Sequence, residues 1–172
     1  MIIRRATRAD EPGIQNVIRT CYELLDWGWF PDDYHKDLYE IDFHYHDKGN
    51  EFYVAEQNGE IIGTAAVDFF PKITGEVGKV KVEGFVSICG SDCSLERLYV
   101  LPSARRQGIG IALWQKTIDR AKAKGCMRME IWSDKLLHEA HAMYENKGAT
   151  RMGDRLCHDP SQSPEWGMAF DI

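Results

Sequence analysis

Two stretches of the chain have apolar residues at helical spacing. A third stretch is followed by a glycine of the kind that commonly ends a helix. The first stretch has its apolar positions at Ile14, Val17, Ile18, Cys21 and Leu25. A cap at Thr7 or Asp10 suits this helix. The second stretch places Ile111, Trp114, Ile118 and Ala121 on one face. This second helix is predicted to end at Gly125. The third helix, over residues 138–146, is predicted to end before Gly148. The pattern therefore predicts three helices.

Runs rich in β-branched and aromatic residues alternate with these helices. Residues 52–55 and 61–67 are joined by Asn58-Gly59, a strong hairpin signal, and are predicted to form adjacent antiparallel strands. Residues 79–88 alternate around three valines and predict either one more strand or an inserted hairpin. Further strands are predicted at residues 2–6, 95–101, 126–132, 151–156 and 167–170.

The order of these elements mixes helices and strands from end to end. The strand, helix and strand within residues 95–132 imply a parallel pair with a right-handed crossover, set among antiparallel hairpins. The 172 residues contain no repeat and no linker. A chain of this length buries roughly 70 % of the surface that its unfolded form exposes. The sequence therefore predicts one α/β domain that covers residues 1–172.

Charge and composition narrow the class of partner. A net charge of −6 argues against a nucleic-acid binder, which neutralises many phosphates with clustered basic residues. No apolar run approaches the ~20 residues that cross a bilayer, and the first residues lack the order of a secretory signal. The five cysteines are odd in number and are interpreted as reduced thiols. We therefore expect a cytoplasmic protein with a small or cationic partner, and neither membrane nor nucleic acid.

Residues 95–113 carry the most informative chemistry. A predicted strand leads into a turn that holds Arg105, Arg106, Gly108 and Gly110 and opens the second helix. Backbone N–H groups at such a helix start point outward at the positive end of the helix dipole and form an anion cradle. The glycines permit close backbone approach and the arginines add charge, so a pyrophosphate suits this turn better than a lone carboxylate. The glycines alone would equally suit a turn with no ligand.

The same stretch resembles the acyl-CoA-binding motif of the GCN5-related N-acetyltransferase (GNAT) superfamily. Its signature is Gln or Arg, two residues, Gly, one residue, then Gly or Ala, and residues 105–110 fit it as Arg-Arg-Gln-Gly-Ile-Gly. Residues 3–10 and 54–67 resemble the family's first three strands and first helix start, and residues 140–148 resemble its late helix. The resemblance implies a GNAT-like mixed, mostly antiparallel sheet that is flanked by helices and splayed at the CoA site.

The resemblance also implies an activity and its residues. The activity is transfer of an acetyl group from acetyl-CoA directly to an amine of a small molecule or peptide. Tyr144 lies where many family members place the phenol that protonates the departing CoA thiolate. The backbone of Leu98, Tyr99 and Val100 would pair with the pantetheine arm, as a short added strand would. The residues that would hold the CoA pyrophosphate are Arg105, Arg106, Gln107, Gly108, Ile109, Gly110 and Ile111.

The sequence departs from the family pattern at three positions. Leu137 stands where an Asn often touches the cofactor, and Ala149 replaces the usual aromatic. The base of histone-type members aligns with Ser94, and Glu96, two residues further on, keeps the same strand face and becomes the candidate base. Each catalytic assignment has a structural alternative: Glu96 as a surface charge at a strand end, and Tyr144 as a packed aromatic.

Residues 22–47 concentrate acidic and aromatic side chains. A surface of this kind suits a cationic amine through charge attraction and cation–π contact. An amphipathic helix pair with an aromatic core and an acidic solvent face would give the same pattern.

No metal site is predicted. His35, His44 and His46 have no cysteine pair or carboxylate at a recognised ligand spacing. The two histidines within residues 138–141 are three apart, where a zinc-peptidase helix needs four.

The motif regions contain no cysteine that could act as a covalent nucleophile, which favours direct transfer of the acetyl group to the amine. One further pair, Cys89 and Cys93, is interpreted as free thiols, with a regulatory disulfide as the alternative.

Two other classes of protein use similar turns. A non-catalytic acyl-CoA-binding sensor would keep the turn and lose turnover, and the presence of both Glu96 and Tyr144 speaks against it. A nucleotide-binding domain would need Gly-Lys-Ser/Thr or the first glycine of a dinucleotide fingerprint, and neither is present. The sequence does not identify the acceptor amine, the role of residues 72–93 or the oligomeric state. It is compatible with a homodimer.

Overall fold

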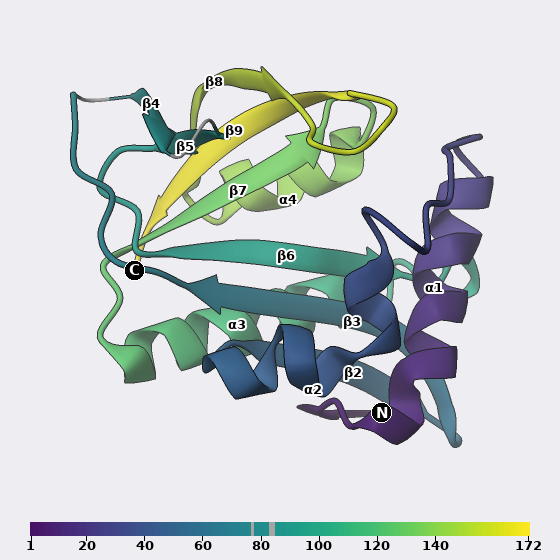
Figure 1. Ribbon diagram of the computed structural model, residues 1–172. Helices are drawn as coiled ribbons and strands as arrows, with labels where there is room; N and C mark the ends of the chain where they lie inside the picture. Colours follow the sequence, from purple (N-terminus) through teal and green to yellow (C-terminus); the bar gives the residue numbers. More distant parts are fainter. Residues whose placement is uncertain (77, 83–84) are drawn as a thin grey trace. The chain divides into compact units, whose positions relative to one another are not determined.

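The computed structural model describes residues 1–76, 78–82 and 85–172 (Figure 1). They form two compact units: Met1–Asp68 with Glu96–Asp119, and Phe69–Leu95 with Arg120–Ile172. Strand β6 (Cys93–Val100) and helix α3 (Ile109–Lys124) each run from one unit into the other.

The strands of the first unit are β1 (Ile2–Arg5), β2 (Glu51–Gln57), β3 (Glu60–Phe69) and the later residues of β6. Their hydrogen-bonded order is β1-β2-β3-β6, and β2 is antiparallel to both β1 and β3. At the β2–β3 turn Asn58 has φ = 55° and Gly59 has φ = 82°. A two-residue hairpin turn of type I′ requires positive φ at both of its central residues. The predicted hairpin is confirmed.

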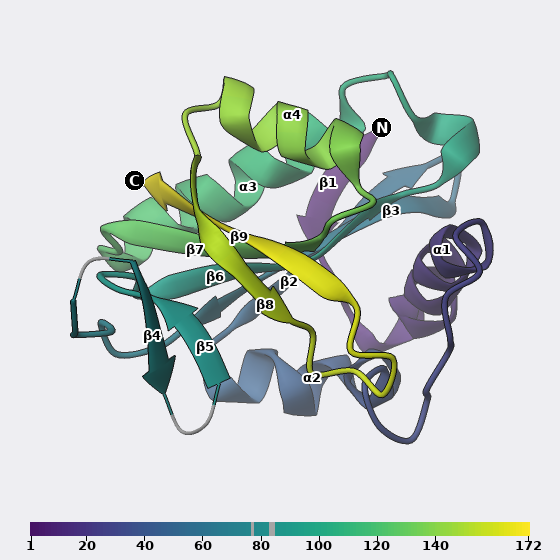
Figure 2. The same cartoon turned by 90° about the horizontal axis from the view of Figure 1, so that it is seen from above.

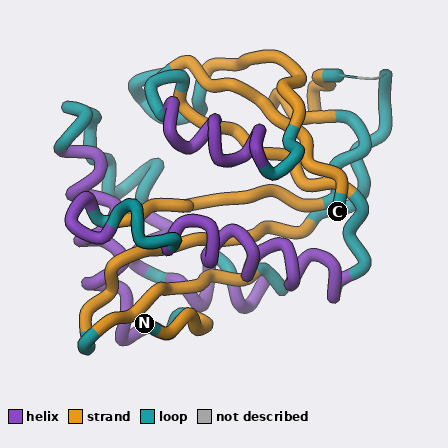
Figure 3. Tube along the Cα trace, turned by 180° about the vertical axis from the view of Figure 1, so that it is seen from behind, coloured by secondary structure: helices purple, strands orange, loops and turns teal. Residues whose placement is uncertain are grey.

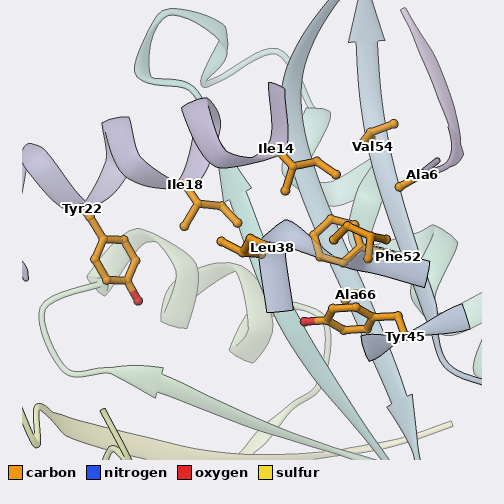
Figure 4. Close-up of a cluster of buried hydrophobic side chains, with 10 residues drawn as sticks. Ala6, Ile14, Ile18, Tyr22, Leu38, Tyr45, Phe52, Val54 and Ala66 are labelled. Carbon is orange, nitrogen blue, oxygen red and sulfur yellow. The ribbon is translucent and has the colours of Figure 1, made fainter. Parts of the chain in front are cut away.

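The helices of the first unit are η1 (Arg8–Asp10), α1 (Glu11–Glu23), η2 (Lys36–Tyr39), α2 (Ile41–His44), η3 (His46–Lys48), η4 (Pro102–Ala104) and most of α3. Within this unit α1 and α2 lie on one face of the strands and α3 on the other (Figure 2). Side chains of α1, η2 and α2 pack on β2 and β3 in a buried cluster that includes Ile14, Leu38 and Phe52 (Figure 4).

The predicted first helix is confirmed, with one correction. Leu25 was expected on its apolar face, but α1 ends at Glu23 and Tyr22 completes the buried stripe. The chain leaves the helix through a turn in which Asp26 adopts φ = 54°, a left-handed conformation that a continuing helix excludes. Leu25 is therefore only partly buried.

The second unit contains β4 (Lys79–Val82), β5 (Phe85–Ile88), the first residues of β6, β7 (Arg128–Asp134), α4 (His138–Asn146), β8 (Thr150–Leu156) and β9 (Pro164–Asp171). The order is β6-β7-β9-β8, and β9 is antiparallel to both its neighbours. Strands β6 and β7 are parallel, which confirms the predicted crossover unit. Their ladder pairs Cys93 with Met129, Ser94 with Glu130 and Leu95 with Ile131.

Strands β4 and β5 form a separate antiparallel pair, so residues 79–88 are an inserted hairpin. Glu83 and Gly84, between these strands in sequence, lie outside the described residues. In the second unit this hairpin and α4 lie on opposite faces of the strands (Figure 2). The Glu130 carboxylate accepts hydrogen bonds from Ile88 N at 2.7 Å and Ser87 Oγ at 3.2 Å. Arg155 donates to Val86 O at 2.8 Å. These bonds attach the hairpin to β7 and β8.

Across the described residues the strand order is β1-β2-β3-β6-β7-β9-β8, an open mixed sheet with flanking helices (Figure 3). The predicted fold class is confirmed. Among the helices of the described ranges, none combines the length and apolar character that a membrane span requires.

Candidate active site

The turn between β6 and α3 has a strained backbone. Arg106 adopts φ = 62° and Gly108 adopts φ = 78°, both in the left-handed region. Glycine tolerates this conformation, whereas an arginine held there costs about 1–3 kcal/mol. Strained backbone conformations are common at ligand-binding turns. They persist only where the surrounding structure holds the backbone in place.

The first amides of α3 precede the hydrogen-bonded part of the helix. The first bond inside the helix runs from Ala112 N to Gly108 O at 3.0 Å. The N–H groups of Ile109, Gly110 and Ile111 precede it and lie at the positive end of the helix. A Cβ built on Gly108 would meet no atom within 4 Å, so the space directly beside this glycine is open.

Arg105 is fixed by two contacts that the sequence did not indicate. Its Nε donates to Val100 O at 3.2 Å, and its Nη2 lies 3.7 Å from Cys21 Sγ. Cys21 sits on α1 and its thiol donates toward the same Val100 O at 3.5 Å. Burial raises the pKa of the Cys21 thiol, although the Arg105 charge acts in the opposite direction. Cys21 is therefore a neutral group that orients Arg105, and a poor nucleophile.

The first turn of α3 packs closely on β3, and this corrects one expectation. A Cβ on Gly63 would lie 3.0 Å from Leu113 Cδ1 and 3.2 Å from Ile109 Cγ2. The buried stripe of the helix thus enters through Ile109, and Ile111, expected on the packed face, is 46 % exposed. The other three expected positions of that face, Trp114, Ile118 and Ala121, are buried.

Strand β6 has an irregular backbone just after the candidate base. Glu96 is half-buried, and the next residue, Arg97, has φ = 51°. The Arg97 carbonyl accepts a hydrogen bond from Thr64 Oγ1 at 2.7 Å, while its guanidinium donates to both Asp37 oxygens and to Tyr34 O. A buried ion pair therefore fixes the irregular residue of β6 to the segment before α2.

The residues expected to face pantetheine follow this irregularity. Leu98, Tyr99 and Val100 are all partly buried. The Tyr99 ring packs against Tyr22 of α1, with ring centroids 5.9 Å apart. Because this side chain is used in packing, the backbone is what Tyr99 has to offer a ligand.

The aromatic residues of segment 22–47 are used mainly in packing. Tyr22 contacts His35 at 4.7 Å, and Trp29 stacks on His35 at 4.0 Å between ring centroids. The protein's own arginines occupy two ring faces, with Arg19 over Trp29 and Arg97 over Tyr34. The aromatic half of the pattern therefore agrees with the packing interpretation. Most acidic residues of the segment are exposed, and one of these, Asp42, contacts His46. The exposed acidic residues are Glu23, Asp26, Asp32, Asp33, Glu40, Asp42 and Asp47.

His35 behaves as a core histidine. Its Nδ1 accepts a hydrogen bond from Phe30 N at 3.1 Å, and burial lowers its pKa to about 4. His46 contacts Asp42 at 2.8 Å.

Asp68, at the end of the first unit, is a candidate that the sequence did not indicate. Its Oδ1 is buried and has no hydrogen-bond partner among the described residues. Burial and, next, the Asp37 charge raise the pKa of this carboxyl to about 6. A carboxylate in this range can take a proton near neutral pH. No sequence signal marks it, because its environment is made by residues from other elements.

Tyr144 belongs to the second unit, on α4, and is 4 % exposed. Burial raises the pKa of its phenol above the ordinary value. The hydroxyl is therefore fully protonated at neutral pH, which is the form that a proton donor needs.

The chain matches known acetyltransferases in sequence and in fold. Residues 18–149 match the model of the Acetyltransferase (GNAT) family. YjgM of Escherichia coli K12, an uncharacterized N-acetyltransferase, is 29 % identical over 152 residues, which cover 86 % of this chain and 80 % of that protein. A GNAT-family acetyltransferase from Staphylococcus aureus Mu50 has a similar structure, with a TM-score of 0.76, 18 % identity and coverage of 99 % of this chain and 98 % of the other. A phosphinothricin acetyltransferase from Sinorhizobium meliloti, in complex with acetyl-CoA, also has a similar structure. Its TM-score is 0.70 at 20 % identity, and the match covers 99 % of this chain and 88 % of the other.

These matches and the arrangement of β6, its turn and α3 define the protein as an acyltransferase. The chain belongs to the GNAT family of acetyltransferases.

Proposed function

We propose that this protein transfers the acetyl group of acetyl-CoA directly to an amine of a small molecule or peptide. The observation that carries the proposal is the turn at residues 105–111, which combines a strained backbone, open space beside Gly108 and the first amides of α3, for which the described residues show no backbone partner. The amides of Ile109, Gly110 and Ile111 and the side chains of Arg105 and Arg106 would bind the pyrophosphate. We also infer that residues 1–172 act as one domain, since β6 and α3 continue through both units.

The proposed chemistry needs a proton donor and an acceptor. Tyr144 would protonate the CoA thiolate as it leaves. Thiols have a pKa near 8.5, whereas the pKa of the Tyr144 phenol lies above its ordinary value of about 10. Proton transfer from the phenol to the thiolate is therefore uphill, and it depends on holding the hydroxyl oxygen close to the CoA sulfur. Direct attack by the amine is favoured because Cys21, the thiol beside Arg105, is buried and neutral.

Two carboxylates compete for the role of base. Glu96 has the place that the family resemblance indicates. Burial raises the pKa of Asp68 to about 6, and its Oδ1 is buried with no hydrogen-bond partner among the described residues. Proton removal from a lysine-like amine by either is costly, whereas an α-amino group with a pKa near 8 needs far less help.

Replacement of Asp68 by Asn should separate a functional carboxylate from a structural one. Its folded-state pKa of about 6 lies above the ordinary 3.8, so the charged form destabilises the fold increasingly as pH rises through this window. Asp68→Asn should therefore stabilise the protein by about 3 kcal/mol at pH 8 and by roughly half as much at pH 5. If Asp68 is the base, kcat/KM should fall and its acidic limb near pH 6 should disappear.

Urea unfolding at the two pH values and a pH profile of kcat/KM measure this. Asp119→Asn, at an exposed carboxylate outside segment 22–47, is the control. Equal stabilisation at both pH values would refute the raised pKa, and an unchanged acidic limb would leave Glu96 as the base.

The acceptor is expected to be cationic because exposed carboxylates concentrate in segment 22–47. Asp32→Asn combined with Asp33→Asn should raise the acceptor KM about threefold at low salt, with little change in kcat, since only long-range attraction is lost. High salt should remove the difference. Glu60→Gln with Asp119→Asn, two exposed acids elsewhere in the first unit, makes the same charge change as a control. A KM that ignores both salt and the substitutions would show the segment to be a solvated face.

The test of the function is a screen for CoA release. Amino acids, polyamines, aminoglycosides and peptide N-termini are each incubated with the protein and acetyl-CoA, and free thiol is measured. We expect release with one of these classes above the rate without an amine. Tight acetyl-CoA binding without release for any class would favour the non-catalytic sensor.

A further inference from the structure

Three side chains with metal-binding atoms meet at the start of β6 and β7 in the second unit. Asp92 immediately precedes β6, Cys93 is its first residue, and Cys126 lies two residues before β7 begins. A carboxylate oxygen and the two Sγ atoms all lie within 4.8 Å of one another. The sequence could not reveal this cluster, because Cys126 reaches it only through the parallel pairing of the two strands.

The spacing is close to that of a tetrahedral metal centre. Zinc binds thiolate sulfur at about 2.3 Å, which places two sulfur ligands of one ion about 3.8 Å apart. The atoms of this cluster would therefore need to move by about 1 Å or less. Two sulfurs with one oxygen form a donor set that suits a thiophilic divalent ion and leaves a fourth position for water.

Burial and neighbouring acidic groups dominate the electrostatics of the cluster. Cys93 is fully buried, and burial is the largest cause that raises the pKa of its thiol. Cys126, Asp92 and Glu130 raise it further. Lys124 is the cation that acts on Cys126. A bound divalent cation would supply positive charge and displace the thiol protons.

The carboxylate is already held in place. Asp92 accepts hydrogen bonds from Met127 N at 2.9 and 3.1 Å and from Arg128 N at 3.2 Å. Ligating carboxylates in metal proteins are commonly oriented by such outer bonds. Asp92 and Cys126 are both partly exposed, which gives an ion a way in.

We propose that Asp92, Cys93 and Cys126 bind one thiophilic divalent metal ion, of which Zn²⁺ is the best fit. The ion joins the first residue of β6 to the segment that leads into β7. Its role is structural, and it takes no part in acetyl transfer.

The test is a titration of the reduced full-length protein with Zn²⁺ against a chromophoric chelator. We expect one ion per chain and a Tm that rises with Zn²⁺. Loss of an outer-shell partner typically weakens metal binding 10–100-fold, so Cys126→Ser, which removes a ligand, should weaken it by more than about 100-fold. Cys89→Ser is the matched control, because Cys89 is also partly buried and its Sγ lies near Gly75 O at 3.2 Å. It should leave binding unchanged.

A second readout identifies the sulfur ligands. Cd²⁺ bound by thiolates gives an ultraviolet charge-transfer band, which should appear with the wild type and weaken in Cys126→Ser. Equal Zn²⁺ affinity in the wild type and Cys126→Ser would overturn the proposal. So would a Cys93–Cys126 disulfide that forms in air while the reduced protein binds no Zn²⁺, because the pair would then be a redox couple.

Discussion

Acetyl-CoA should bind at least about 100-fold more weakly once Gly108 is replaced by tryptophan. A Cβ at this position meets no protein atom within 4 Å, so the new side chain would occupy the open space beside this glycine. That space is where the proposed pyrophosphate must approach the amides of Ile109 and Gly110, and an indole would fill it. Calorimetry with acetyl-CoA measures the effect.

The backbone strain of the substitution has a matched control. Gly125 has φ = 81°, close to the 78° of Gly108, and a Cβ there also meets no atom within 4 Å. Gly125→Trp should therefore cost similar stability and leave acetyl-CoA binding intact. Undiminished affinity in folded Gly108→Trp would remove the turn from the cofactor site.

The second large effect is expected at Tyr144. Tyr144→Phe keeps the ring that fills the buried site on α4 and removes only the hydroxyl, so acetyl-CoA affinity should change little. Loss of a general acid typically costs about 100-fold or more in turnover. Because burial raises the pKa of this phenol, kcat of the wild type should also show no alkaline decline up to about pH 10.

Steady-state kinetics and calorimetry of the variant measure both parts. Tyr53→Phe is the control, since Tyr53 is equally buried and lies in the first unit. Wild-type turnover in Tyr144→Phe would make Tyr144 a packing residue.

The elements that the sequence predicted well are those with local causes. The helix at residues 138–146 and the Asn58-Gly59 hairpin depend on stop signals and turn chemistry that neighbouring residues carry. Ile111 was misplaced because the buried stripe of α3 is set by its fit against Gly63 of β3, which spacing along the helix cannot reveal. Leu25 was misplaced because the chain turns at Asp26.

The candidate site divides in the same way. The turn at residues 105–110 is continuous in sequence and could be predicted from its own glycines and arginines. Cys21 beside Arg105, and the Arg97–Asp37 ion pair, join elements far apart in the chain. Their contribution depends on strand order and helix packing, and a single sequence contains no pairing information of that kind.

The most direct test of the central claim is the mass of the acceptor after incubation with acetyl-CoA. The best amine from the screen should gain one acetyl group with the wild type and with Gly125→Trp, and none above background with Gly108→Trp. Loss of acetyl-CoA without any acetylated amine, or equal acetylation by Gly108→Trp, would contradict the assignment of this protein as an N-acetyltransferase that acts through this turn.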